Sequence, residues 1–273
     1  MKNLKQFKHF LDKKSGVKVE GNHLYLYSEI GNWWDESEAI QIVNKIKEMQ
    51  GDITVHVNSE GGSVFDGMAI MNALRQHSGK KTFIIEGLAA SIASVIVCGA
   101  SDKTIAMAGS CMMIHKAWNL AVGNADELRK SAEVLDGIDK EIISIYNKKT
   151  KMPSEELTKK LAEEWWMFPQ TAKDNGFVDE IDSDNEAVYL NQTNLSAFNN
   201  VPNEIRNKIK ANKPQSVREF EQELRNLGYS SKEAKAIISK GYNALRDVDA
   251  DNNKDNEMLL EKLIFERSNT LTI

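Results

Sequence analysis

The sequence predicts an α/β fold built on a mainly parallel sheet. Two observations carry this prediction. Short apolar runs with strand-like alternation recur along residues 23–114, and the first three of them are each followed by a segment with apolar residues at helical spacing. Repeated strand-then-helix order with short connections is typical of parallel sheets covered by helices. The composition fits a globular protein, because 41% of the 273 residues are hydrophobic and 27% are charged.

The elements follow one another closely along the first half of the chain. Strands are predicted where apolar runs are short or alternate with polar residues: 23–27, 53–57, 82–85, 103–107 and 112–114. Helices are predicted where apolar residues recur every three or four positions: 35–49, 64–74, 89–98 and 126–149. The apolar stretch 87–100 is too short to span a bilayer and is expected to be a buried helix. The long stripe along 126–149 must pack against another surface.

The composition changes near residue 184. Residues 184–215 are rich in asparagine and lack sustained periodicity, which predicts a linker with at most a short helix around 203–211. Further helices are expected beyond it: 217–227, 231–245 and 258–265. The chain is therefore divided into three parts: a domain at 1–183, a linker at 184–215 and a helical C-terminal extension at 216–273.

Charge and cysteine content argue against several classes of protein. There are 35 Lys and Arg residues against 40 Asp and Glu, so no bulk positive field exists to hold a nucleic acid or an anionic membrane. Cys98 and Cys111 are too few for a disulfide framework, and the N-terminus lacks the apolar core of a secretory signal. We therefore expect a cytoplasmic protein without a nucleic-acid or membrane partner.

Three segments of the first domain could carry chemistry. Gly61 and Gly62 link a strand to a helix, and paired glycines can present N–H groups to an anion, although a simple tight turn uses the same residues. Ser91 lies where an apolar helix begins, and its hydroxyl could serve either as a nucleophile or as a helix cap. His115 ends an apolar strand, as a general base or as a structural histidine. Spacing alone does not show whether these groups meet.

Five ordered motifs between residues 24 and 181 resemble the Clp protease proteolytic subunit family, and most closely its phage branch, the ClpP-like head maturation (prohead) proteases. The motifs are Asn58-Ser-Glu-Gly-Gly-Ser-Val64, Asp66-Gly-Met-Ala-Ile70, Gly87-Leu-Ala-Ala-Ser-Ile-Ala-Ser94, Met113-Ile-His115 and Gly176-Phe-Val-Asp-Glu-Ile181. The resemblance implies the repeated ββα spiral shared by ClpP and crotonases, with a long handle helix at 126–149. The tail lies outside the motifs and looks like the small helical extension of phage members.

The resemblance also implies the chemistry. Ser91 matches the nucleophile of the family and His115 its general base, while the backbone N–H groups of Gly62 and Ile92 match the oxyanion hole. The reaction implied is peptide-bond hydrolysis through an acyl-enzyme, by a serine endopeptidase that needs no metal and no organic cofactor.

Two positions depart from the pattern of the housekeeping subunit. The orienting acid falls on Glu164, where housekeeping members have aspartate, and Asp174 and Asp179 are the nearby alternatives. Glu60 replaces the proline usual before the glycine pair. A longer carboxylate can still accept a hydrogen bond from an imidazole, although its reach differs by one methylene.

The implied partners are polypeptides, including capsid or scaffold proteins, and other copies of the chain in a heptameric ring, alone or stacked as a tetradecamer. The implied setting is capsid maturation, in the host cytoplasm or the procapsid. One alternative is a housekeeping-type proteolytic subunit working with a separate ATP-driven unfoldase. Others are a crotonase-type acyl-CoA enzyme, which would not require Ser91 and His115, and a catalytically silent structural subunit, which the departure at Glu164 favours.

Overall fold

The structure, a computed structural model, describes residues 17–31, 38–189, 195 and 198–211, together with the single positions 218, 221, 231 and 235. The chain forms two compact units, residues 1–212 and residues 213–273. The helices expected at 217–227, 231–245 and 258–265 fall outside the described residues, apart from those four positions.

The first unit is built on one mixed sheet, in which eight strands are described. Their bounds are β1 Val17–Glu20, β2 His23–Ile30, β3 Ile53–Gly62, β4 Lys81–Ala90, β5 Lys103–Ala108, β6 Cys111–Ile114, β7 Trp165–Met167 and β8 Glu180–Glu186. The main path runs β1-β2-β3-β4-β5-β8, and β6 pairs with both β4 and β7. Five of these pairings are parallel, β2–β3, β3–β4, β4–β5, β4–β6 and β5–β8, so the mainly parallel sheet is confirmed.

Helices α2, α3 and α4 alternate with strands as the sequence predicts, whereas α6 and α7 were not predicted and α6 follows α5 without a strand between them. Their bounds are α2 Glu38–Glu48, α3 Val64–Gln76, α4 Ile92–Ala100, α5 Ala125–Thr150, α6 Ser154–Ala162, α7 Pro169–Asp174 and α8 Asn203–Ala211. One prediction is wrong in detail: residues 87–90 belong to β4 and not to a helix. Ala89 pairs with Ser59 of β3 and Leu88 with Cys111 of β6, so strand pairing on both sides outweighs the helical propensity of the alanines.

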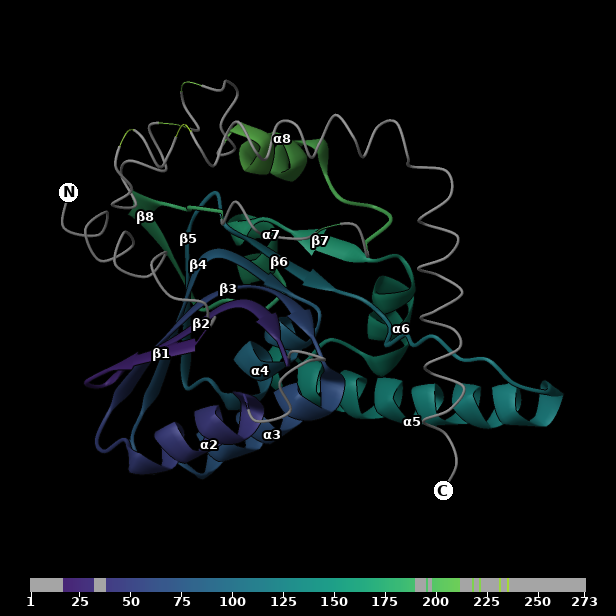
Figure 1. Cartoon of the computed structure of the whole chain (residues 1–273). Helices are drawn as coiled ribbons and strands as arrows, with labels where there is room; N and C mark the ends of the chain where they lie inside the picture. Colours follow the sequence, from purple (N-terminus) through teal and green to yellow (C-terminus); the bar gives the residue numbers. More distant parts are fainter. Residues whose placement is uncertain are drawn as a thin grey trace. The chain divides into compact units, whose positions relative to one another are not determined.

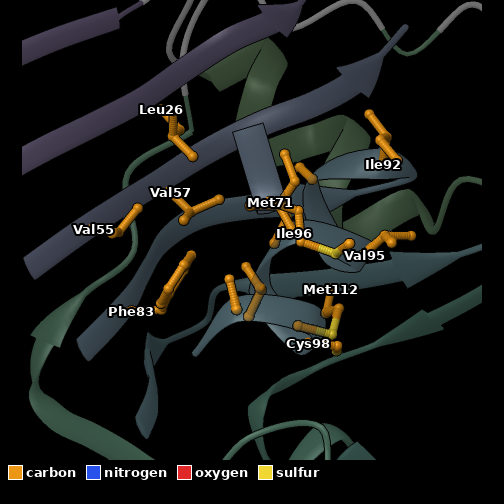
Figure 2. Close-up of a cluster of buried hydrophobic side chains, with 14 of the residues drawn as sticks. Leu26, Val55, Val57, Met71, Phe83, Ile92, Val95, Ile96, Cys98 and Met112 are labelled. Atoms are coloured by element: carbon orange, nitrogen blue, oxygen red, sulfur yellow. The ribbon is translucent and has the colours of Figure 1, made fainter. Parts of the chain in front are cut away.

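The main core lies between the sheet and α4, as Figure 2 shows. Alternate residues of the central strands, such as Val55, Val57 and Phe83, point into it and are essentially inaccessible to water. Helix α4 is buried on nearly every side, because eight of its nine residues lie in the interior. The residue at its N-terminus is therefore held by a rigid element. No helix among the described residues is long and apolar enough to cross a bilayer.

A second apolar cluster forms where the chain continues beyond β8. Tyr189, Phe198, Val201 and Ile205, the last on α8, are buried against Leu88, Ala90 and Met113 of β4 and β6. Figure 1 shows α8 and the pair α2 and α3 on opposite sides of the strands. The described part of 184–215 thus differs from the linker that its composition predicts: the short helix at 203–211 is present, but it packs on the sheet.

Candidate active site

The sheet brings Ser91 and His115 together. Ser91 follows β4 directly and His115 follows β6, and these strands pair in parallel with Ala90 opposite Met113. The Ser91 N–H donates to the Met113 carbonyl at 3.0 Å. The two side chains then meet, with His115 Nε2 2.7 Å from Ser91 Oγ. The register of two neighbouring strands therefore decides the contact that sequence spacing left open.

Ser91 has an unusual backbone conformation. Its φ is 55° and its ψ is −130°, a region that a residue with a Cβ rarely adopts and that is found preferentially at functional sites. The hydroxyl makes no capping hydrogen bond to α4, so the helix-cap interpretation is wrong for this serine. Ser94, one turn further along, donates from its hydroxyl to the Ser91 carbonyl at 2.6 Å and lies 2.8 Å from the Tyr146 hydroxyl. These contacts of Ser94 fix the backbone turn that directs Ser91 toward His115.

The glycine pair lies against this turn. Gly61 has a φ of 99°, and a Cβ placed on it would come within 2.6 Å of the Ser91 Cβ and 3.2 Å of the Ile92 nitrogen. Gly62 has a φ of 143° and pairs with Ile30 of β2, so these residues continue β3 and do not form a simple tight turn. Only a residue without a side chain allows β3 to approach the nucleophile this closely.

The start of α4 adds favourable electrostatics for an anion. Ile92 is the first residue of α4, where backbone N–H groups have no acceptor within the helix and the helix dipole is positive. A negatively charged oxygen beside Ser91 would therefore be stabilised at this end of the helix.

The environment of His115 favours its neutral form. Burial lowers the pKa of the imidazole below its ordinary value, and the carboxylates of Glu164 and Asp139 oppose that effect by raising the pKa. The net shift is downward. His115 is therefore unprotonated at neutral pH and can accept a proton from Ser91.

Glu164 is held mainly by the chain beyond β8. Its carboxylate is nearly buried, and its Oε1 accepts hydrogen bonds from the Asn200 N–H at 2.7 Å and the Trp166 Nε1–H at 3.1 Å. Its Oε2 accepts from the Asn199 N–H at 2.9 Å. Within the described part of the chain, no hydrogen bond joins Glu164 to His115, so the carboxylate acts on the imidazole through its charge in this structure.

A second carboxylate near His115, Asp139, was not predicted. It lies on the buried side of α5, where its Oδ1 accepts the Ala117 N–H at 2.8 Å and its Oδ2 is 3.9 Å from the Lys116 Nζ. It therefore fixes the backbone just after His115. The sequence carried one signal for it, since Asp139 lies four residues after Leu135 and three before Ile142, on one face of the long helix.

The two alternative acids lie in other surroundings. The Asp179 Oδ2 accepts the Thr104 N–H at 2.6 Å and a hydrogen bond from the Lys149 Nζ at 2.7 Å, so this carboxylate ties β5, α5 and the start of β8 together. Asp174 is exposed at the end of α7 and accepts a hydrogen bond from the Gln170 side chain. Neither contributes to the pKa shift of His115.

Comparison with known proteins adds the family. The family model described as Clp protease matches residues 19–185, which is more than half of the chain. The chain belongs to the Clp protease family. The match includes β2 to β7, all but the last residue of β8, and every group of the site except the N–H groups of Asn199 and Asn200. The resemblance found in the motifs and the fold that it implies are both confirmed, while the match does not separate a phage branch from the housekeeping one.

Several curated relatives are named ATP-dependent Clp protease proteolytic subunits. One from Bacteroides fragilis is 33% identical over 131 residues, which make up 48% of this chain and 63% of the relative. One from Oltmannsiellopsis viridis is 30% identical over 143 residues, covering 52% and 73%. A proteolytic subunit 2 from Thermobifida fusca is 29% identical over 158 residues, covering 56% and 78%. The aligned part of this Clp family member thus spans less than two thirds of the Bacteroides relative.

Proposed function

We propose that this chain is a serine endopeptidase that hydrolyses peptide bonds through an acyl-enzyme. The observation that carries the proposal is the 2.7 Å contact between Ser91 Oγ and His115 Nε2, made by a histidine whose pKa is lowered by burial. A hydroxyl beside a neutral imidazole is the arrangement that a serine nucleophile requires. The names of the curated relatives support the same reaction.

The proposed mechanism assigns one role to each group. His115 Nε2 removes the proton from Ser91 Oγ while the oxygen attacks the carbonyl carbon of the scissile bond. The N–H groups of Gly62 and Ile92 bind the oxygen that becomes negative. His115 then gives its proton to the leaving amine as the C–N bond breaks. Water, deprotonated by the same imidazole, attacks the acyl carbon, and the imidazolium returns the proton to Ser91 Oγ as the ester bond breaks. Glu164 stabilises the imidazolium by its charge.

Covalent labelling tests the proposal. A fluorophosphonate probe followed by peptide mapping should modify Ser91, and both Ser91→Ala and His115→Ala should abolish labelling and peptide hydrolysis. Ser101→Ala is the matched control, because this serine lies at the other end of α4 and bonds only to Thr104 among the described contacts of its side chain. An unlabelled Ser91 in the folded wild-type chain would refute the proposal and favour a silent structural subunit or an acyl-CoA enzyme.

We propose that the active form is a homo-oligomeric ring. Apolar side chains on α5 and on the loop before it support this, since Leu128, Val134, Trp118, Leu120 and Val122 are all exposed in the single chain. Figure 1 shows the N-terminal part of α5 extending away from the sheet. A second copy of the chain can cover this surface. Light scattering of the purified chain measures the assembly.

For the biological setting we propose capsid maturation, with capsid or scaffold polypeptides as substrates. The chain beyond residue 185, which the family model does not match, supports a specialised role. The alternative is a proteolytic subunit that works with an ATP-driven unfoldase, and the name of the relatives supports that alternative. Degradation of a folded substrate only when an ATP-driven unfoldase and ATP are added would favour the alternative. Cleavage of a capsid precursor by the chain alone would favour capsid maturation.

A further inference from the structure

The chain beyond β8 contributes directly to the surroundings of His115 and Glu164. The ring of Phe198 stands edge-on to the imidazole of His115, with centroids 5.6 Å apart and an angle of 83°. The same ring stands edge-on to Trp166, at 5.6 Å and 84°. Phe198 is only 8% exposed, so it covers one side of the catalytic imidazole with hydrocarbon.

The next two residues hold the carboxylate. The N–H groups of Asn199 and Asn200 donate to different oxygens of Glu164, at 2.9 and 2.7 Å, and the Asn200 side chain donates to the Glu163 carbonyl at 3.2 Å. Two consecutive backbone N–H groups donate hydrogen bonds to the two oxygens, and this fixes the orientation of the carboxylate plane. They also compensate for the burial of its charge, which is costly without hydrogen-bond donors.

This segment is anchored to the strands that carry the nucleophile and the base. Val201 and Ile205 are buried in the cluster formed with Leu88 and Ala90 of β4 and Met113 of β6. Residues 198–201 are therefore fixed relative to both Ser91 and His115, and they are not a loose connection that happens to pass the site.

We infer that residues 198–201 are a positioning element of the catalytic site, in which the Asn199 and Asn200 amides orient Glu164 and Phe198 excludes water from His115. The inference rests on the proposed peptidase function and deepens it. It assigns a chemical role to a segment that the family model does not match. A carboxylate has about four lone-pair sites, and Glu164 uses three of them, so Oε2 keeps the capacity to accept a bond from His115 when the imidazolium forms.

The charged groups around His115 determine the direction in which each variant should shift the pKa of the imidazole. Glu164 faces it from the turn before β7, and Asp139 faces it from α5, with Lys116 3.9 Å from the Asp139 carboxylate. Burial lowers the pKa of His115 and both carboxylates raise it. Loss of the Phe198 ring hydrates the imidazole and raises its pKa, whereas displacement of Glu164 lowers it.

The experiment measures the rate of fluorophosphonate labelling of Ser91 against pH in full-length variants. Phe198→Ala should move the acid limb of the profile, where protonation of His115 slows labelling, to higher pH. Phe198→Leu should show a smaller shift. Asn200→Pro removes the N–H donor, and it should lower the plateau at least tenfold and move the acid limb to lower pH. Asn200→Ala loses only the side-chain bond and should be affected less than Asn200→Pro.

Two controls separate positioning from general destabilisation. Asn203→Pro places a proline at the first position of α8, where it is tolerated, and should leave the profile unchanged. Ile46→Ala opens a cavity in the main core, a cluster that does not include residues 198–205, and should lower the melting temperature without moving the acid limb.

The outcomes are distinct. Opposite shifts of the acid limb in Phe198→Ala and Asn200→Pro, with both melting transitions cooperative, support the inference. Variants that are labelled like the wild-type chain at every pH overturn it while leaving the peptidase proposal intact. Equal losses of rate in both variants with unmoved acid limbs also overturn it. Absence of labelling in the wild-type chain overturns the peptidase proposal, and the inference with it.

Discussion

The close approach of β3 to the nucleophile makes Gly61→Ala a severe test of the site geometry. An added Cβ would lie 2.6 Å from the Ser91 Cβ and 2.8 Å from the Ala90 carbonyl oxygen. Ordinary contact begins near 3.4 Å, so the two backbones must separate by about 0.8 Å. A misplacement of ~1 Å in a catalytic site can cost about 100-fold in rate. We therefore expect Gly61→Ala to reduce the labelling of Ser91 by a factor of roughly 30 to 100.

The control for this variant is Gly21→Ala. Gly21 also has a positive φ, +56°, but nothing lies within 4 Å of the position of its Cβ. This substitution should cost only the left-handed strain of about 1–2 kcal/mol, and it should leave the labelling rate unchanged. Melting curves and labelling rates of both variants decide the matter. If Gly61→Ala is labelled within threefold of the wild-type rate, the argument that β3 must abut the nucleophile is wrong.

Three further predictions concern charge, burial and assembly. Glu164→Gln should move the acid limb of Ser91 labelling to lower pH, because the carboxylate raises the pKa of His115, and it should also lower the plateau. Both cysteines should resist a thiol reagent at pH 8 in the native chain and react after unfolding, because burial raises the pKa of each thiol to about 12. The double variant Leu128→Glu and Val134→Glu should reduce the mass measured by light scattering, because it places charges on the exposed apolar part of α5; an unchanged mass would show that this surface makes no contact between copies.

Much of the fold could be predicted because burial imposes a period on the sequence. β3 buries alternate residues at 53–57, and α5 extends over 125–150, one residue beyond each end of the predicted helix. The sequence predicts a helix at 87–90 because a short run of leucine and alanine has no period that separates a strand from a helix. Pairing with β6 makes this run a strand, and the residues of β6 lie more than twenty positions further along the chain.

The site could be predicted only in part. The motifs named Ser91 and His115, but the 2.7 Å contact between them depends on the pairing of β4 with β6, which no local pattern encodes. Asp139 was missed because one carboxylate on a charged helix looks like a solvated residue until the fold buries it. The partners of Glu164 were also missed, since Asn199 and Asn200 bind it through backbone N–H groups that any residue except proline supplies.

Composition was least informative for residues 184–215. Asparagine-rich sequence predicts a linker because its side chains bury little apolar surface, yet here four irregularly spaced apolar residues do the packing: Tyr189, Phe198, Val201 and Ile205. Irregular spacing is sufficient because Tyr189, Phe198 and Val201 lie outside the described helices and strands, and only Ile205 lies in a helix, α8. A chain ending at residue 183 would leave Leu88, Ala90 and Met113 without this cover and Glu164 without two of its three donors. The compact unit that holds the proposed active site therefore ends beyond α8, at residues 212–213.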